Sequence, residues 1–200
     1  MVSFNKFWRI LATGFCFSIF GLGGVLFGLF IFPVLGVFYS DSKVRQTKVR
    51  SLIKCLFHFF IRLMVFVGIM RLKIQGLKEL SESEGLIVIA NHPSLIDVVV
   101  LIAYIKNADC IVKSHLLKNP FMRWVILNAG YISNSDPEAL LQQCRKSLDA
   151  GSNLIIFPEG TRNKTNRTLT SFKEGSRIIA LKNRLPILPL YIQSDADKVL

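Results

Sequence analysis

The sequence lacks closely spaced cysteines. Its four cysteines are scattered along the chain, and no two of them form a C-x-x-C pair. Neither a zinc site nor a disulfide framework is therefore indicated. We expect the four to be small buried apolar residues in a protein kept in a reducing compartment. They are Cys16, Cys55, Cys110 and Cys144.

A second absence is that of charge between Ile10 and Tyr39. This apolar run is long enough to cross a bilayer, and it is too long for a secretory signal peptide and lacks a clear small-residue cleavage site. Its interior contains "GLGG" at residues 21–24 and a proline, Pro33. These residues permit two interpretations, a single tilted span or a helical hairpin that dips into one leaflet and returns.

Acidic residues are scarce in the first part of the chain. Residues 1–80 hold 11 basic and 2 acidic residues, a balance of +9, whereas residues 81–200 hold 14 and 11, a balance of +3. The basic excess flanks the apolar run, as expected for a protein held against anionic lipid headgroups. Its position directly after the run favours a cytoplasmic location for the rest of the chain. Nucleic-acid binding is not expected, because no recognition motif accompanies the charge.

Residues 50–70 combine a basic stripe with a wide apolar face. Arg50, Lys54, His58 and Arg62 recur every four residues, and most of the remaining residues are Leu, Ile, Phe, Met and Val. Such a helix suits the membrane interface, and the alternative is a helix buried against the following domain. His58 is interpreted as part of the stripe, without a catalytic role. We expect residues 1–70 to be membrane-anchoring helices.

From residue 71 onward, short apolar segments alternate with helical patterns. Short apolar strands interleaved with helices indicate a sheet that is covered on both faces. We expect an α/β fold with a mixed, mostly parallel sheet flanked by helices, preceded by the membrane-associated helices. The expected strands are residues 71–76, 85–91, 109–113, 130–133, 153–158 and 186–192, and the expected helices are 95–106, 116–129, 136–150 and 172–183.

The segment "NHPSLID" places His92 and Asp97 after one of these strands. Sites in open α/β sheets lie beyond the carboxyl ends of strands, so a neutral imidazole here could take a proton from an attacking hydroxyl. Asp97 could bond the other ring nitrogen and stabilise the imidazolium. A structural alternative stays open. Ser94 and Asp97 also form a pattern like a capping box, in which Asp97 only bonds backbone at the helix start. His92 would then be an ordinary loop histidine.

A second strand ends in the polar turn "FPEGTR", residues 157–162. Gly160 allows a tight backbone turn, and the guanidinium of Arg162 suits phosphate. Taken alone, the turn could carry a surface arginine. Two such strand ends in one α/β domain favour a site.

These motifs resemble those of the lysophospholipid acyltransferase superfamily, of the 1-acyl-glycerol-3-phosphate acyltransferase kind. The family's H-x4-D motif matches His92 and Asp97, and its F-P-E-G-T-R motif matches residues 157–162 without a substitution. The resemblance extends over about residues 72–192. Further similar blocks are "VKSHLLKNP" (112–120), "SFKEG" (171–175) and "LPILPLYI" (185–192).

The resemblance implies acyl transfer from acyl-CoA or acyl-acyl carrier protein to the hydroxyl of a lysophosphatidic acid-like acceptor. His92 would be the general base and Asp97 its orienting partner. Neither a cofactor nor a metal is expected, and the partners would be membrane lipids and the acyl donor. Residues 71–200 would be the acyltransferase domain, on the cytoplasmic face of a bacterial inner membrane. Glu159, Gly160, Thr161 and Arg162 would bind the acceptor head, with Lys113 and Lys173 adding positive charge.

Two departures from the family pattern affect these expectations. The family's second motif runs from a glycine to an arginine six residues later, but here Gly130 is followed by Asp136 at that position. A carboxylate facing the pocket would repel phosphate, which would favour a glycolipid, aminolipid or aryl-polyene-type acceptor; alternatively, Asp136 only caps the next helix. The chain also ends eight residues after "PLYI", so we expect a short member or a truncated chain.

Two rival functions remain. One is a lipid-binding relative without turnover, favoured by the missing arginine of the second motif. The other is a hydrolase that uses the same base on water, although no G-x-S-x-G elbow is present.

Overall fold

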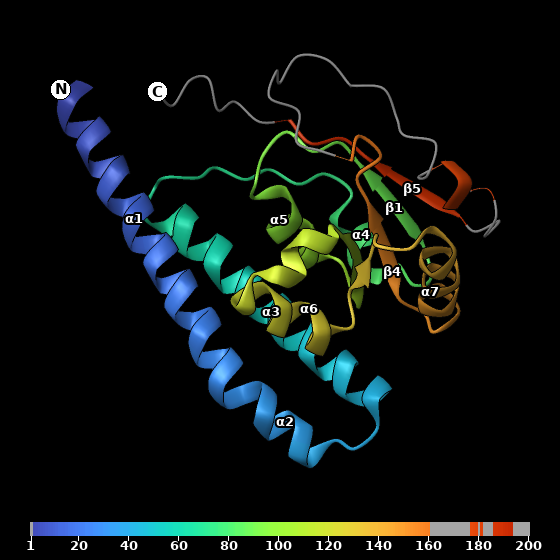
Figure 1. The fold of residues 1–200 in the computed structure, drawn as a ribbon. Helices are drawn as coiled ribbons and strands as arrows, with labels where there is room; N and C mark the ends of the chain where they lie inside the picture. Colours follow the sequence, from blue (N-terminus) through green and yellow to red (C-terminus); the bar gives the residue numbers. More distant parts are fainter. Residues whose placement is uncertain (1, 161–176, 180, 182–185, 194–200) are drawn as a thin grey trace.

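The computed structural model describes residues 2–160, 177–179, 181 and 186–193. The described strands form a five-stranded sheet in the order β3-β2-β4-β1-β5, with helices on both sides (Figure 1). Each described strand pair is parallel. The predicted α/β class, a mostly parallel sheet flanked by helices, is confirmed. The strands are β1 (Ile87–Ala90), β2 (Ala108–Val112), β3 (Ile132–Ser133), β4 (Asn153–Ile156) and β5 (Ile187–Leu190).

Neighbouring residues of the central strands belong to different hydrophobic cores. Val88 and Ile155, which are paired across β1 and β4, lie in a core on one face of the sheet. Ile87 and Leu154, one residue earlier, lie in a second core on the other face. Successive strand side chains point to opposite faces, so continuous apolar strands are the pattern that a sheet covered on both sides requires.

Helices precede or follow the first four strands in the part of the chain up to residue 160, and the boundaries of two of them can be compared with the expectations. The helix expected over residues 116–129 is divided, because Asn119 has an extended backbone before Pro120 and a residue before proline disfavours the helical region. The helix expected over residues 136–150 is present, with Asp136 as its N-cap and Pro137 as its first residue. The helices are α4 (Leu77–Glu82), α5 (Asp97–Tyr104), the 3-10 helix η2 (Ser114–Lys118), α6 (Pro120–Ala129) and α7 (Pro137–Asp149).

The N-terminal part is one continuous helical rod of α1 (Val2–Leu26), the π-helical turn η1 (Phe27–Ile31) and α2 (Phe32–Phe38). No turn interrupts it, so a hairpin inside the apolar run is excluded. The π turn has a physical cause, since Pro33 lacks an N–H and its ring would clash with the preceding turn of a regular α-helix. Residues 5–38 are long and apolar enough to cross a membrane by length and composition.

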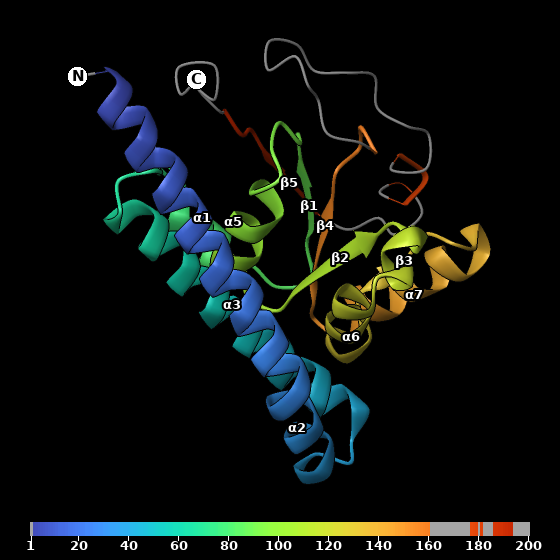
Figure 2. The same cartoon turned by 60° about the vertical axis from the view of Figure 1, so that its left-hand side comes forward.

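The chain reverses after the rod, and α3 (Ser42–Phe66) returns alongside α1 (Figures 1 and 2). Asp41 caps α3 by accepting from the backbone N–H groups of Lys43 at 2.7 Å and Val44 at 3.3 Å. Aromatic contacts join the two helices, with the ring centroids of Phe20 and Phe60 4.6 Å apart. The other side of α3 packs on α5 and α6.

The basic stripe of α3 faces the α/β domain over most of its length, which corrects its interpretation as a surface for lipid headgroups. Lys54 Nζ donates to the carbonyl oxygen of Tyr104 at 3.2 Å, and burial lowers the pKa of this lysine. His58 contacts the Tyr104 ring edge to face, with centroids 5.1 Å apart. Arg62 is exposed. The alternative expectation, a helix packed against the domain, describes the stripe better.

Arg50 is the most enclosed member of the stripe, with 8% of its side chain exposed. Its guanidinium forms an ion pair with Asp109 of β2, Nη2 to Oδ2, at 2.7 Å. It also donates to the carbonyl oxygen of Ala129 at 2.7 Å and to Ser152 Oγ at 2.9 Å. Asp109 accepts a further hydrogen bond from Ser147 Oγ at 2.5 Å. These contacts tie α3 to the amino-terminal edge of the sheet.

Residues 71–76, expected as a strand, form no regular element. Leu72 and Ile74 are half-buried between exposed neighbours, but the segment has no pairing partner in the described sheet. All four cysteines are free, and Cys55 is exposed, whereas the other three are buried as expected. Burial raises the pKa of Cys144 to about 12. Most of the helix expected over residues 172–183 lies outside the described residues, with 177–179 and 181 helical.

Candidate active site

Two polar turns meet at the carboxyl ends of β1 and β4. These strands are parallel neighbours in the sheet, so the segments that follow them emerge at the same edge. Asn91 and His92 follow β1, and Phe157 to Gly160 follow β4. This is the edge at which open α/β sheets place their ligands. The two sequence motifs, 67 residues apart between His92 and Glu159, are therefore brought together by strand pairing.

The His92–Asp97 dyad is formed as expected. His92 Nδ1 lies 3.0 Å from Asp97 Oδ2, and the two side chains are 15% and 3% exposed. The carboxylate also accepts from Ser94, from the backbone N–H at 2.6 Å and from Oγ at 2.5 Å. Asp97 therefore bonds both the Ser94 backbone, as the capping-box alternative expected, and the imidazole. A full capping box is not formed, because α5 begins at Asp97 with Ile96 as its N-cap and no side-chain cap.

The hydrogen bond to Asp97 determines what the imidazole can do. A carboxylate at Nδ1 holds the ring proton on that nitrogen, which leaves the lone pair of Nε2 of His92 available to accept a proton. The same carboxylate stabilises the imidazolium once the proton has arrived. Chemically, this arrangement is able to serve as a general base with an orienting partner.

Phe157 and Glu159 of the second motif contact His92 directly. The Phe157 ring stacks on the imidazole with centroids 4.3 Å apart and an interplanar angle of 26°. Glu159, which is 4% exposed, accepts from the backbone N–H of His92 at 3.4 Å through Oε1. The second motif thus packs around the first. The expected role of Glu159 in binding the acceptor head stays a prediction.

The turn itself depends on a glycine. Gly160 has φ +65°, and its N–H donates to the carbonyl oxygen of Phe157 at 3.0 Å. A residue with a side chain rarely adopts this left-handed conformation. Thr161, Arg162 and Lys173, which were expected to bind the acceptor, lie outside the described residues.

Asn91 is a residue whose role the sequence analysis missed. Its Nδ2 donates to the carbonyl oxygen of Ile192 at 2.7 Å, and its Oδ1 accepts from the Ile192 N–H at 2.6 Å. The side chain therefore bridges the segments that follow β1 and β5. The available signal was an asparagine directly after an apolar strand, since an amide can replace a missing backbone partner.

Lys113 and Asp136 lie toward the other side of this edge. Lys113 is exposed and directly follows β2, the neighbour of β4. Asp136 accepts from the backbone N–H groups of Glu138 at 2.9 Å and Ala139 at 3.4 Å, so it caps α7 as the alternative interpretation stated. Its carboxylate is engaged at the helix start, which weakens the argument that it repels an acceptor phosphate.

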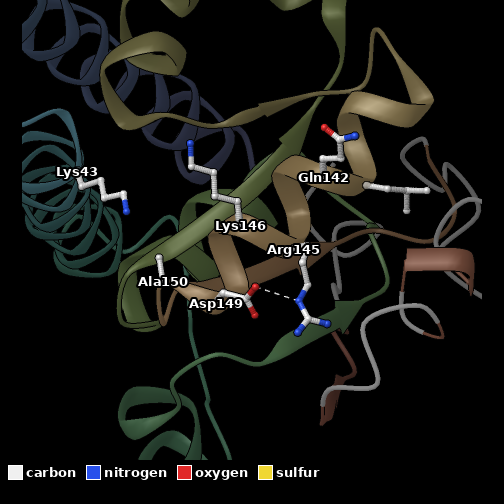
Figure 3. Close-up of a pocket in the computed structure, with 7 residues that line it drawn as sticks. Lys43, Gln142, Arg145, Lys146, Asp149 and Ala150 are labelled. Atoms are coloured by element: carbon white, nitrogen blue, oxygen red, sulfur yellow. Dashed lines mark hydrogen bonds and ion pairs between the residues drawn. The ribbon is translucent and has the colours of Figure 1, made fainter.

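A hollow of about 730 Å³ lies away from the dyad, between α3 and α7 (Figure 3). Lys43, Arg145 and Lys146 line it, and Arg145 is paired with Asp149 at 3.0 Å. Because α7 ends just before β4 begins, the hollow lies at the opposite edge of the sheet from His92. Among the residues that the structure describes, no cluster of three or more His, Cys, Asp or Glu could hold a metal ion.

Comparisons with known proteins agree with the geometry. The family model described as Acyltransferase matches residues 71–193. The 1-acyl-sn-glycerol-3-phosphate acyltransferase of Helicobacter pylori is 37% identical over 112 residues, which cover 53% of this chain and 47% of that protein. The Pseudomonas aeruginosa enzyme of the same name is 26% identical over 167 residues, which cover 80% of this chain and 64% of that enzyme. The chain thus spans roughly half the length of the curated relatives it matches.

A solved structure has the same fold. The crystal structure of PlsC, the 1-acyl-sn-glycerophosphate acyltransferase of Thermotoga maritima, superposes with a TM-score of 0.70. The two sequences are 24% identical, and the superposed region covers 92% of this chain and 74% of the PlsC chain. The family resemblance inferred from the two motifs is therefore confirmed, and the chain belongs to the acyltransferase family.

Proposed function

We propose that this protein transfers a fatty acyl group from acyl-CoA or acyl-acyl carrier protein to the free hydroxyl of a lysophosphatidic acid-like acceptor. The observation that carries the proposal is the His92–Asp97 pair at 3.0 Å, at the sheet edge where the second family motif packs against it. The names of the relatives support the acceptor.

The chemistry needs no nucleophile from the protein. His92 Nε2 takes the proton from the acceptor hydroxyl while that oxygen attacks the thioester carbonyl carbon. The tetrahedral intermediate collapses with cleavage of the carbon–sulfur bond, and the leaving thiolate takes the proton from the imidazolium. Asp97 stabilises the imidazolium between the two transfers, and general base catalysis of this kind contributes about 10²- to 10⁴-fold.

The acceptor we favour carries a phosphate. The doubt about it rested on the missing arginine of the second motif and on Asp136, whose carboxylate is bonded to the first backbone N–H groups of α7. Lys113 adds an exposed cation after β2, and Arg162 of the family motif is the expected phosphate ligand. A glycolipid, aminolipid or aryl-polyene-type acceptor is the alternative that an acceptor panel would reveal.

The N-terminal rod supports attachment to a membrane. Most of its large apolar side chains are exposed, including Leu29, Phe30, Val37 and Phe38 at 61–79%. A rod that crossed the bilayer would pull α3 and its ion-paired Arg50 into hydrocarbon, because α3 lies along α1. We therefore place the rod along the membrane surface, with its exposed face in lipid. The cytoplasmic face of a bacterial inner membrane stays our prediction for the location.

The test is the His92→Ala variant, assayed with acyl-CoA and lysophosphatidic acid in mixed micelles. Acylated product measured by mass spectrometry, and released thiol, should fall by about 10²- to 10⁴-fold. The activity of Asp97→Asn should fall by a similar factor, because the amide no longer stabilises the imidazolium. His115→Ala, an exposed histidine of η2, is the matched control and should keep full activity.

Each rival function has its own result in this assay. Full activity of His92→Ala would overturn the mechanism. Free fatty acid without acylated product would indicate a hydrolase, and the absence of thiol release from the unmodified chain with every acceptor tested would indicate a non-catalytic lipid-binding protein.

A further inference from the structure

A second exposed apolar surface lies on α6, outside the N-terminal rod. Trp124 and Leu127 are 49% and 58% exposed. Together with Arg123 and Asn128 they surround a shallow hollow of about 240 Å³, and we call these four residues the α6 face. Residues three and four apart share one side of a helix, so the four side chains project from the same side.

The buried side of α6 determines where the α6 face points. Ile126 and Ala129 are 2% and 0% exposed, and Ala129 belongs to the core beneath α3 and α5. The helix is thus held firmly by one side, and the α6 face is turned away from the domain. Its exposure does not result from a loosely attached segment.

The α6 face is next to the proposed membrane surface of the rod. α6 contacts η1 and α3, and Figure 2 shows it beside the lower half of the N-terminal helices. Leu29 and Phe30 of η1 are 62% and 61% exposed. Exposed apolar side chains therefore occur on two elements that touch each other, which favours one extended surface with one kind of partner.

The charged residues of the sequence segment that contains α6 have a single sign. No acidic residue occurs between Cys110 and Ser135, a segment that contains Lys113, Lys118 and Arg123. Cations beside exposed apolar side chains suit a surface of anionic phospholipids, which attracts each Lys or Arg. Tryptophan is suited to the same boundary, because its ring is apolar and its N–H is polar. An acidic protein would also match the charge, but the contact of α6 with the exposed apolar turn η1 favours a membrane.

We propose that α6 is a second membrane-contacting element of this protein. Trp124 and Leu127 enter the boundary between headgroups and acyl chains, and Arg123 pairs with a lipid phosphate. The proposal rests on the membrane attachment of the rod proposed above and adds to it. A rod lying on a membrane can roll about its own axis, so a second contact on α6 determines which side of the α/β domain faces the lipid.

The chain offers a direct test, because it has two tryptophans, Trp8 and Trp124. The full chain with Trp8→Phe reports on Trp124 alone, and the Trp124→Phe chain reports on Trp8 of α1. Each is mixed with vesicles of phosphatidylcholine and phosphatidylglycerol whose acyl chains carry bromine near the headgroup or near the chain end. We expect Trp124 emission to shift to shorter wavelength and to be quenched more by the shallow bromines.

Each other outcome overturns the proposal in a distinguishable way. Quenching of Trp8 without quenching of Trp124 would remove α6 from the membrane and leave the attachment of the rod. If neither Trp8 nor Trp124 were quenched, neither the rod nor α6 would contact the membrane. A Trp124 shift that depends on protein concentration without vesicles would assign the face to a second copy. Acyl transfer, measured separately in mixed micelles, shows whether the proposed enzyme activity fails independently.

The cation of the α6 face has its own test. Arg123→Gln should weaken partitioning into anionic vesicles by about fivefold at low salt, the effect of one cation near a charged surface. Arg145→Gln is the matched control, since Arg145 lies on α7 and pairs with Asp149. Equal partitioning of both variants would contradict a contact through Arg123.

Discussion

At the scale of single residues, the site shows how one side chain can satisfy two expectations. The sequence pattern around Asp97 allowed either a helix-start contact or a histidine partner. Asp97 Oδ2 accepts from both the Ser94 N–H and His92 Nδ1, while Oδ1 accepts from Ser94 Oγ. A carboxylate has about four acceptor positions, so the two roles do not compete. A spacing in the sequence could not show this, because it depends on side-chain direction.

The stack of Phe157 on His92 leads to a prediction. The face of a phenyl ring attracts a cation, so Phe157 should stabilise the imidazolium that forms during acyl transfer. Loss of such a contact costs about 0.5–2 kcal/mol, so Phe157→Leu should lower kcat by roughly two- to thirtyfold with little change in KM. Steady-state kinetics in mixed micelles measures both constants.

Phe157→Tyr is the control for this prediction, because it keeps the aromatic face against the imidazole. It should retain most of the activity. If the leucine and tyrosine variants lost kcat equally, or if KM alone rose, the ring would serve packing or acceptor binding instead.

At the scale of elements, the basic stripe of α3 is the feature whose expected surroundings differ most from the observed ones. The four-residue spacing of its basic side chains predicted a polar stripe on one side of a helix, and the stripe exists. Its direction is inward, because Arg50 finds Asp109 and the carbonyl oxygen of Ala129. Basic side chains on an apolar helix suit a lipid surface and a buried ion pair equally well. Which of the two surroundings Arg50 adopts depends on the carboxylate of Asp109, 59 residues away in the sequence.

The buried ion pair predicts unequal effects along the stripe. Arg50→Met leaves Asp109 as an uncompensated buried charge, which lowers the free energy of unfolding by about 3–5 kcal/mol. Arg62→Met, on the exposed part of the same helix, should change it by less than about 0.5 kcal/mol. Urea unfolding in detergent, followed by circular dichroism, measures the difference. Equal stability of the two variants would show that the Arg50 ion pair contributes little.

At the scale of the whole molecule, the core does not stop at the expected boundary at residue 70. Val49 and Ile53 of α3 are buried in the same cluster as Val88 of β1 and Leu101 of α5. The division into residues 1–70 and 71–200 stays a prediction about the roles of the two parts. For stability, α3 contributes to the core that covers one face of the sheet.

A truncation experiment tests this shared core. A chain of residues 71–200 loses the burial of Val49 and Ile53, worth about 3–6 kcal/mol, and leaves Asp109 unpaired at about 3–5 kcal/mol. The sum is comparable with the about 5–15 kcal/mol of a whole domain, so this chain should not unfold cooperatively. A chain of residues 42–200 keeps α3 and should unfold cooperatively. Cooperative thermal unfolding of both would place α3 outside the stable core.

The sequence by itself determined the α/β class, the two motif turns and the long apolar run, because each is a local pattern of hydrophobicity or of adjacent residue types. The tertiary structure decided which patterns meet. Pairing of β1 with β4 brought Phe157 and Glu159 onto His92, Pro33 was accommodated by a π turn inside an unbroken rod, and the stripe of α3 turned inward. These outcomes depend on contacts between segments far apart in the chain, which no local pattern specifies.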